Sequence, residues 1–245
     1  MLDQIKNLLR LLGYEAHRYT VQTSSGAQLS QLIKQVGIDR VLDVGANTGQ
    51  YAKHIRAHGY AGRILSFEPL SAAHARLLQT ARKDQRWSIA PRMALGDAQG
   101  EITIHVAGNM ISSTVLDMLP VHEAAAPGSK FTSSEIVPIA RLDQVAADFL
   151  GTSRAAFLKM DTQGYEDRVL DGAQGVMDRI CGIQTELSLT PLYEGQLLFD
   201  EMRARIEAKG FVLYAILPGY VHPVTSRTLQ IDGIFLRREL ADRTV

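Results

Sequence analysis

The sequence has almost no cysteine, because Cys181 is the only one among 245 residues. A lone cysteine cannot form a disulfide within the chain, and it cannot supply the paired thiolates of a structural zinc site. This usage is typical of a reducing compartment. We therefore expect a cytoplasmic protein, although a secreted protein with few cysteines would have the same composition.

The sequence also has no excess of charge of either sign and no long apolar segment. Lysine plus arginine and aspartate plus glutamate each number 26, so the formal net charge is zero. A protein whose main partner is nucleic acid normally carries a basic surplus, so we expect no nucleic-acid partner. The first residues, MLDQIKNLLRLLG, are too short and too charged for a signal peptide or a membrane-spanning helix, and we expect no spanning segment.

Residues 1–37 are predicted to form a helical segment that packs on the core. Apolar residues recur there at the spacing of one helix face, namely at Leu2, Ile5, Leu8, Leu9 and Leu12. Contact with a membrane surface or with a second copy of the chain is the alternative, and the second of these leaves a homodimer open.

Residues 38–245 are predicted to form one doubly wound α/β domain, because short apolar runs alternate with helical patterns. The last two apolar runs, 211–217 and 231–237, have no room for a crossover helix between them. We therefore expect an antiparallel pair at the end of a mostly parallel sheet. The other expected strands cover residues 40–44, 63–67, 88–94, 155–160 and 182–189.

The stretch over about residues 100–140 departs from this rhythm. Ile102–Val106 and Ile136–Ile139 alternate as exposed strands do, and a long polar loop joins them. A loop of this length inside a compact domain is usually functional. We predict an inserted hairpin with a lid, in which residues 110–113 touch a cofactor or an acceptor.

The stretch VLDVGANTGQY over residues 41–51 runs an apolar strand into a glycine turn and then into a helix. A nicotinamide-binding turn normally reads G-x-G-x-x-G, where the second glycine lets the backbone approach a pyrophosphate. Here the turn consists of Gly45, Ala46, Asn47 and Gly49, and Asn47 replaces that glycine. A ligand without phosphate fits better. S-adenosylmethionine is such a ligand, because its charged end is an amino acid and its sulfonium is cationic.

Three acidic residues follow the first three expected strands, whose carboxyl ends meet at one edge of the sheet. Asp43 can interact with the methionyl ammonium, Glu68 can accept hydrogen bonds from both ribose hydroxyls, and Asp97 can accept one from the adenine amino group. Pro69 and Asp161 complete the predicted cofactor site, with Asp161 next to where the sulfonium should point. A plain tight turn without a ligand is the alternative for Gly45 and Gly49.

Several motifs resemble the FkbM-type family of S-adenosylmethionine-dependent methyltransferases. They are VLDVGANTGQY, SFEP, ALGD and FLKMDTQGYEDRVLDGA, and the likeness continues through TELSLTPLYEG and AKGF to IDGIFLRR. The family pattern Lys-x-Asp-x-Glu-Gly-x-Glu is matched by Lys159, Asp161, Gly164 and Glu166, but Gln163 stands where glutamate is usual. The resemblance implies a Rossmann-like class I methyltransferase sheet and O-methylation of sugars, glycolipids or related secondary metabolites.

Methyl transfer to a hydroxyl needs alignment and a base or cation that helps the hydroxyl lose its proton. Asp161 is the first candidate for the base, with helix capping as its alternative role. Lys159 lies on the same side of the strand and can orient it. Glu186 is a second acidic candidate. Asp161, Glu186 and Asp232 together could hold a magnesium ion, which is the alternative to a lone base.

The acceptor is expected to be a small molecule or a glycan. Two other functions are alternatives. One is an NAD(P)-dependent reductase, which Asn47 and the lack of a Tyr-x-x-x-Lys pair disfavour. The other is a catalytically inactive cofactor-binding subunit, which the intact acidic set disfavours. The residues expected to contact the acceptor are Ser112, Ser113, His122, Tyr193 and His222.

Overall fold

Short apolar strands form the centre of the fold in the computed structural model, which describes residues 2–243. β1 (Arg40–Val44), β2 (Arg63–Phe67) and β7 (Ala156–Met160) are buried along almost their whole length. This is the pattern of parallel strands that are covered by helices on both faces. Their carboxyl ends meet at one edge of the sheet, where residues after each strand can converge.

The main sheet has seven strands in the order β3-β2-β1-β7-β8-β10-β9, and only β10 runs antiparallel to its neighbours. The predicted doubly wound sheet with a C-terminal antiparallel pair is confirmed. The strand order reverses between β1 and β7, and ligands of such sheets bind at this switch point. The remaining strands of this sheet are β3 (Trp87–Ile89), β8 (Ile180–Ser188), β9 (Phe211–Pro218) and β10 (Gln230–Arg237).

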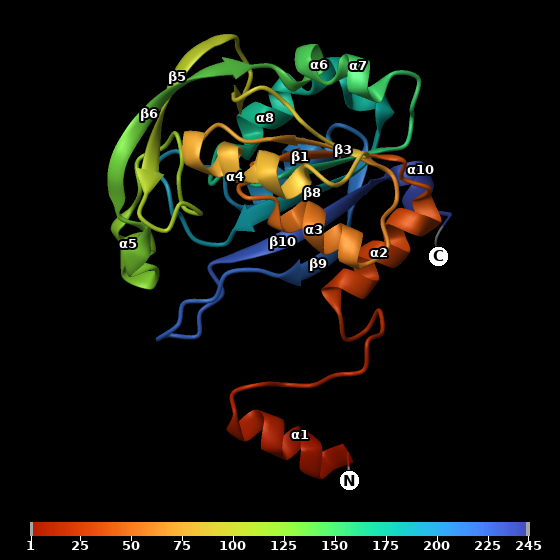
Figure 1. Ribbon diagram of the computed structural model, residues 1–245, viewed down its shortest axis with the longest axis vertical. Helices are drawn as coiled ribbons and strands as arrows, with labels where there is room; N and C mark the ends of the chain where they lie inside the picture. Colours follow the sequence, from red (N-terminus) through yellow and green to blue (C-terminus); the bar gives the residue numbers. More distant parts are fainter. Residues whose placement is uncertain (1, 244–245) are drawn as a thin grey trace.

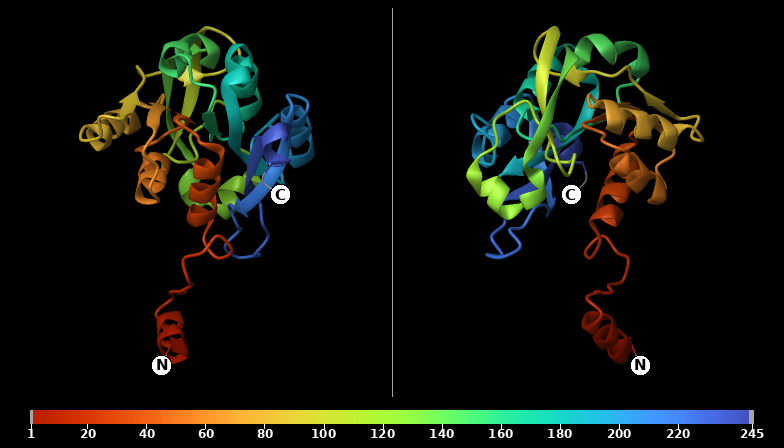
Figure 2. Two further views of the ribbon diagram at one scale, coloured as in Figure 1. Left: turned by 90° about the vertical axis from the view of Figure 1, so that its right-hand side faces the viewer. Right: turned by 60° about the vertical axis from the view of Figure 1, so that its left-hand side comes forward.

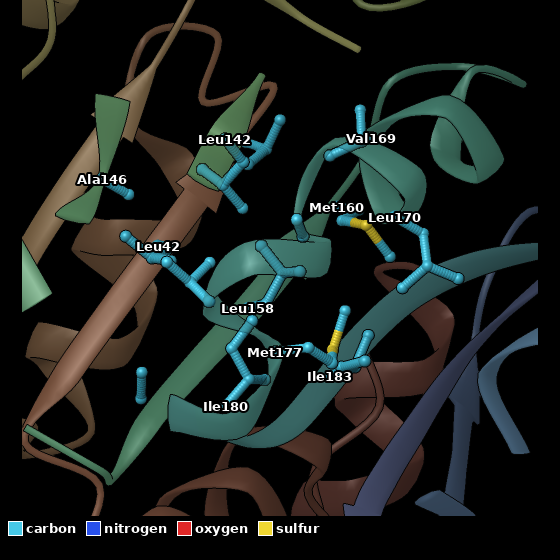
Figure 3. Packing of buried hydrophobic residues seen from close by; sticks show 14 of the residues in the cluster. Leu42, Leu142, Ala146, Leu158, Met160, Val169, Leu170, Met177, Ile180 and Ile183 are labelled. Atoms are coloured by element: carbon cyan, nitrogen blue, oxygen red, sulfur yellow. The ribbon is translucent and has the colours of Figure 1, made fainter. Parts of the chain in front are cut away.

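Helices cover both faces of the main sheet (Figure 1). One face packs against α2 (Ser25–Val36), α3 (Gln50–Ala57), α4 (Ser71–Ala81) and α10 (Arg238–Ala241). Figure 3 shows the core on the other face, where Leu42 and Leu158 of the sheet lie near Leu142, Val169 and Leu170 of the helices. The helices of that face are α6 (Leu142–Val145), α7 (Ala147–Leu150), α8 (Glu166–Gly172), the 3-10 helix Gln174–Arg179 and α9 (Phe199–Glu207).

A separate three-stranded sheet, in the order β4-β6-β5, stands beside the main one (Figure 1). β5 (Gly100–Ala107) and β6 (Phe131–Ala140) are antiparallel, as the sequence predicts. The loop between them carries α5 (Pro120–Ala125) and the short 3-10 helix Pro127–Ser129. The hairpin stands beside the carboxyl edge of the main sheet, where the parallel strands end.

The expected single strand over residues 88–94 is wrong. β3 ends at Ile89, and the next strand, β4 (Ala94–Leu95), belongs to the small sheet and pairs with β6. Pro91 lies between them, and proline lacks the amide that a continuing central strand needs. The chain therefore leaves the main sheet before it reaches Asp97.

Residues 1–37 contain two helices, α1 (Leu2–Leu11) and α2, which differ in their contact with the core. α2 buries Leu29, Leu32 and Ile33, whereas α1 stands away from the body of the protein in all three views (Figures 1 and 2). Its apolar side chains have no core to cover, and Leu8 is 60% exposed. Within residues 2–243, no helix is both long and apolar enough to cross a membrane.

Candidate active site

A cavity of about 380 Å³ opens at the carboxyl edge of the main sheet, at the switch point between β1 and β7. Its size and its mixture of apolar walls with a few polar groups are typical of small-molecule sites. The strands supply the polar floor, and the small sheet and its loop supply much of the apolar wall. That wall includes Met93, Leu95, Ile104, Met110, Ile111 and Val115.

The glycine turn after β1 lies at one side of this cavity, but its glycines are required first by the protein itself. Gly45 has φ +74°, and a Cβ there would lie 1.9 Å from the carbonyl oxygen of Asp161. A Cβ on Gly49 would lie 2.6 Å from the ring of Trp87. Gly45 and Ala46 still line the cavity. The glycines therefore allow the turn after β1 to approach the residue that follows β7. The backbone of the same turn also lines the cavity.

Asn47 also lines the cavity, with its backbone in the left-handed region at φ +48°. Its backbone N–H donates to Glu68 Oε2 at 2.8 Å, and its side-chain oxygen accepts from the N–H of Thr48 at 2.7 Å. The Asn47 amide nitrogen lies 3.5 Å from the carbonyl oxygen of Met110. The turn and the loop of the small sheet thus meet at this residue, which fits the prediction that residues 110–113 lie beside the site.

Glu68 presents its carboxylate at the end of β2 and lines the cavity, as does Pro69. Oε1 accepts from the backbone N–H of Leu70 at 2.9 Å, while Oε2 accepts from Asn47. Burial raises the pKa of Glu68 to about 7, and these two backbone N–H groups only partly oppose the rise. Each oxygen keeps a lone pair for a further donor, such as a sugar hydroxyl.

The expected gathering of three carboxylates in one crevice is wrong for Asp43 and Asp97, since neither lines the cavity. Asp43 is fully buried behind it and accepts a hydrogen bond from the Ser66 hydroxyl at 2.9 Å. Asp97 follows β4 rather than β3 and forms an ion pair with Arg168 at 3.0 Å. Of the three, Glu68 alone lines the cavity, and the predicted adenine contact of Asp97 has no support in its position.

Lys159 connects the buried Asp43 to the cavity. Its Nζ lies 3.6 Å from Asp43 Oδ1, 3.2 Å from Asp161 Oδ2 and 3.2 Å from the carbonyl oxygen of Gly45. Burial lowers the pKa of Lys159, but the carboxylates of Asp161 and Asp43 outweigh it and raise the pKa above its usual value. Lys159 is therefore a buried cation held beside Asp161, and its orienting role stays a prediction.

Asp161 and Glu186 face each other across the amide group of Gln163. Gln163 Nε2 donates to Asp161 Oδ1 at 2.9 Å and to Glu186 Oε2 at 2.7 Å. All three residues line the cavity, together with Asp232. Burial and the neighbouring carboxylates of Asp161 and Glu166 raise the pKa of Glu186 well above its usual value. Burial, followed by the charge of Asp161, raises the pKa of Asp232 to about 6.

The alternative of a magnesium ion held by Asp161, Glu186 and Asp232 is not supported. Within residues 2–243, no three His, Cys, Asp or Glu side chains are arranged to hold a metal ion. The amide nitrogen of Gln163 lies between two of the three predicted ligands and donates to both. A cation would have to displace it.

The residues predicted to contact the acceptor are not all brought together. Ser113 lines the cavity, whereas Ser112 is buried beside it and bonds to Asn109. Tyr193 is buried below the site, and its hydroxyl donates to Gln163 Oε1 at 2.7 Å. His122 packs edge-on against the Tyr193 ring, and burial lowers the pKa of His122. His222 caps a surface turn by accepting from the N–H groups of residues 224 and 225.

Tyr51 and Gln184 are among the polar lining residues that the sequence motifs do not indicate. The hydroxyl of Tyr51 and the Oε1 of Gln184 are buried and have no hydrogen-bond partner within residues 2–243. Tyr51 also places its ring 5.5 Å from Lys159 Nζ. Buried polar groups are nearly always paired, so a bound ligand or an ordered water is the expected partner of both atoms. Only their positions in the sequence could have indicated them, since Tyr51 follows the glycine turn and Gln184 shares a strand face with Glu186.

These residues fit S-adenosylmethionine. Glu68 and the backbone of the turn provide polar partners, while Met93, Leu95 and Ile104 provide an apolar wall for a flat base. Tyr51, Gln184 and Asp161 line the same cavity.

The fold and the site together define a class I methyltransferase, with its glycine turn after β1, its carboxylate after β2 and its acidic group after β7. The FkbM methyltransferase domain matches residues 43–213 of the chain. The chain therefore belongs to the FkbM methyltransferase family, and this assignment supports S-adenosylmethionine as the methyl donor.

Several known proteins are similar to the chain. The 2-O-methyltransferase NoeI of Sinorhizobium fredii is 26% identical over 163 residues, which cover 64% of this chain and 66% of NoeI, just under two thirds. Fibrillarin from Aeropyrum pernix with bound S-adenosylmethionine has a TM-score of 0.48 at 12% identity, covering 86% of this chain and 73% of fibrillarin. Fibrillarin from Methanococcus jannaschii has a TM-score of 0.47 at 10% identity, covering 82% and 66%. These two scores are too low to bear on the acceptor.

Proposed function

We propose that the protein is an S-adenosylmethionine-dependent O-methyltransferase that acts on a hydroxyl of a sugar, a glycolipid or a related secondary metabolite. One observation carries this proposal: a single cavity holds the ribose-side carboxylate of Glu68 and, across the switch point, the carboxylate of Asp161 fixed by Lys159. S-adenosylmethionine, when bound, supplies an electrophilic methyl group beside Asp161.

Asp161 is the base in this proposal. Its side chain is 35% exposed to the cavity, so an acceptor hydroxyl can reach it. Lys159 and Gln163 each donate to one of its oxygens and leave the other lone pairs for the hydroxyl proton. Holding the acceptor oxygen and the base in this geometry accelerates the transfer by alignment as well as by proton removal.

The charge of the cavity supports a neutral or cationic acceptor. Its charged lining residues within the described chain are four carboxylates, Glu68, Asp161, Glu186 and Asp232, and one cation, Lys159. Lys159 is already paired with Asp43 and Asp161. A phosphate or a nucleic-acid backbone would meet carboxyl groups there and no lining cation, within the described residues, that is not already paired. A sugar hydroxyl would meet hydrogen-bond acceptors.

The relative NoeI supports transfer to oxygen, because its name is that of a 2-O-methyltransferase. The loop over residues 110–113 acts as a lid in this proposal, since Met110, Ile111 and Ser113 line the cavity. The lone cysteine supports a cytoplasmic location.

A reductase is disfavoured because Asn47 fills the turn, and an inactive subunit is disfavoured because the base and its orienting cation are both present.

Incubation with methyl-labelled S-adenosylmethionine and a panel of neutral sugars, glycolipids and their phosphorylated forms tests this function. We expect label on a neutral hydroxylated acceptor, and a fall in turnover of about 100-fold in Asp161→Asn with cofactor binding retained. Label only on phosphorylated acceptors, or wild-type turnover in Asp161→Asn, would contradict the proposal.

A further inference from the structure

The amide of Gln163 is held in one orientation on all sides. Its nitrogen faces the carboxylates of Asp161 and Glu186, and its oxygen faces the hydroxyl of Tyr193. Rotating the amide by half a turn would place its oxygen against two acceptors. The residue is 7% exposed, and its backbone is fixed by the Thr114 hydroxyl, which donates to the Gln163 carbonyl oxygen at 2.7 Å.

Backbone strain accompanies this placement. Gln163 has φ +56°, a region that side-chain-bearing residues seldom adopt. Such strain persists only where the surroundings impose it, and it is concentrated at functional sites. Here the surroundings are the paired carboxylates in front and the buried Tyr193 ring behind. The chain therefore holds this amide in place at an energetic cost.

The amide connects two carboxylates that would otherwise repel each other. Glu186 is surrounded by charged and titratable groups from every neighbouring element: Asp161 and Lys159 around β7, Glu166 on α8, Asp232 on β10 and Tyr193 in the loop after β8. Two donors from one neutral group fix the positions of both carboxylates without adding charge. A cation could bridge the same two oxygens only where the Gln163 nitrogen now lies.

We propose that Gln163 is a positioning residue that aligns Asp161 for the acceptor hydroxyl and replaces a bridging metal ion between Asp161 and Glu186. This inference rests on the proposed function, because it concerns the base of that reaction. The hydroxyl of Tyr193 extends the chain of hydrogen bonds into the loop after β8, where Gln196 Oε1 accepts from the Tyr193 backbone N–H at 2.8 Å. Tyr193 thus orients Gln163, which orients Asp161.

The test compares Gln163→Glu, Gln163→Met and Tyr193→Phe with wild type, and Gln35→Glu on the exposed side of α2 is the control for the added charge. S-adenosylhomocysteine binding is measured by calorimetry, turnover by labelled methyl transfer with and without a chelator, and Mn²⁺ binding by electron paramagnetic resonance. Calorimetry and Mn²⁺ binding do not depend on knowing the acceptor.

We expect wild type and Gln35→Glu to turn over equally with chelator and to bind no Mn²⁺ in the millimolar range. Gln163→Glu should bind Mn²⁺, because a third carboxylate then replaces the amide. Both Gln163 variants should bind S-adenosylhomocysteine like wild type and lose kcat by about 100-fold with KM nearly unchanged. Tyr193→Phe removes only the hydrogen bond to Gln163 Oε1 and keeps the Gln163 amide, so its loss of kcat should be smaller.

Wild-type kcat in Gln163→Met, or loss of wild-type activity with chelator, would overturn the inference while leaving the proposed function intact. A wild-type protein that is folded but fails to bind S-adenosylhomocysteine would overturn the proposed function instead. Circular dichroism of each variant separates a loss of alignment from a failure to fold.

Discussion

Replacing Lys159 with methionine should destabilise the protein by leaving a carboxylate buried without its cation. Asp43 is fully buried, and the Lys159 side chain is 8% exposed at 3.6 Å from it. After the change, Asp43 keeps the Ser66 hydroxyl as its donor. Breaking a buried pair from one side costs about 3–5 kcal/mol. Methionine fills a volume similar to that of lysine, so little of the loss comes from a cavity.

The loss should depend on pH, because Asp43 can become neutral. Burial already raises the pKa of Asp43, and Lys159 partly opposes that rise. Without Lys159 the folded-state pKa rises further above the unfolded value. The folded variant then binds a proton that the unfolded chain releases, so its stability increases as the pH falls through the folded pKa. The destabilisation should therefore be larger at alkaline than at acidic pH.

Urea unfolding followed by circular dichroism measures this effect, and a fall in Tm of about 6–20 °C should accompany it. The double variant Asp43→Asn/Lys159→Met removes both charges and should recover most of the stability. A loss below about 1 kcal/mol in Lys159→Met, the size expected of an exposed pair, would refute this reasoning. So would a double variant that is no more stable than the single one.

Two further changes test the turn and the ribose carboxylate. Gly45→Ala should lose about 1–3 kcal/mol through its positive φ and more through contact with the Asp161 carbonyl oxygen. Gly37→Ala is the matched control, because Gly37 has the same φ of +74° but an added Cβ there would have no atom within 4 Å. If thermal unfolding shows equal losses of stability in the two variants, the contact with the Asp161 carbonyl oxygen does not contribute. Binding of S-adenosylhomocysteine should tighten as the pH rises through about 7, where Glu68 ionises. Calorimetry should show a flat profile in Glu68→Gln, and a flat wild-type profile would contradict the ribose role.

The sequence predicted those parts of the site that depend on one strand and the turn after it. The glycine turn, Glu68 at the end of β2, and Lys159 with Asp161 around the end of β7 all lie at the cavity, because parallel strands bring their carboxyl ends to one edge. Alternation within each strand was enough to place Lys159 and Asp161 on one side.

The parts that failed depend on contacts between distant segments. Asp97 does not line the cavity, because the chain departs from the main sheet after β3 and joins a second sheet. The link from Tyr193 through Gln163 to Glu186 joins residues 23 and 30 positions apart, and no local pattern encodes that meeting. α1 has a clear apolar periodicity, but periodicity does not specify which surface, if any, it covers.

The glycines show how one pattern can have two causes. A turn lined by glycine predicts a close approach, and the structure shows that the approaching groups at Gly45 and Gly49 are the Asp161 carbonyl and the Trp87 ring. The cavity lies on the remaining open side of the turn, where it is lined by Gly45, Ala46 and Asn47. Packing and binding therefore require the same residues.

Calorimetric titration with S-adenosylhomocysteine, run beside a titration with NADPH, tests most directly whether this cavity holds a sulfonium nucleoside. The account predicts micromolar-range binding of S-adenosylhomocysteine and no binding of NADPH, because Glu68 and Asn47 leave no place for a diphosphate. A folded protein that binds NADPH instead, or that binds neither molecule, would contradict it.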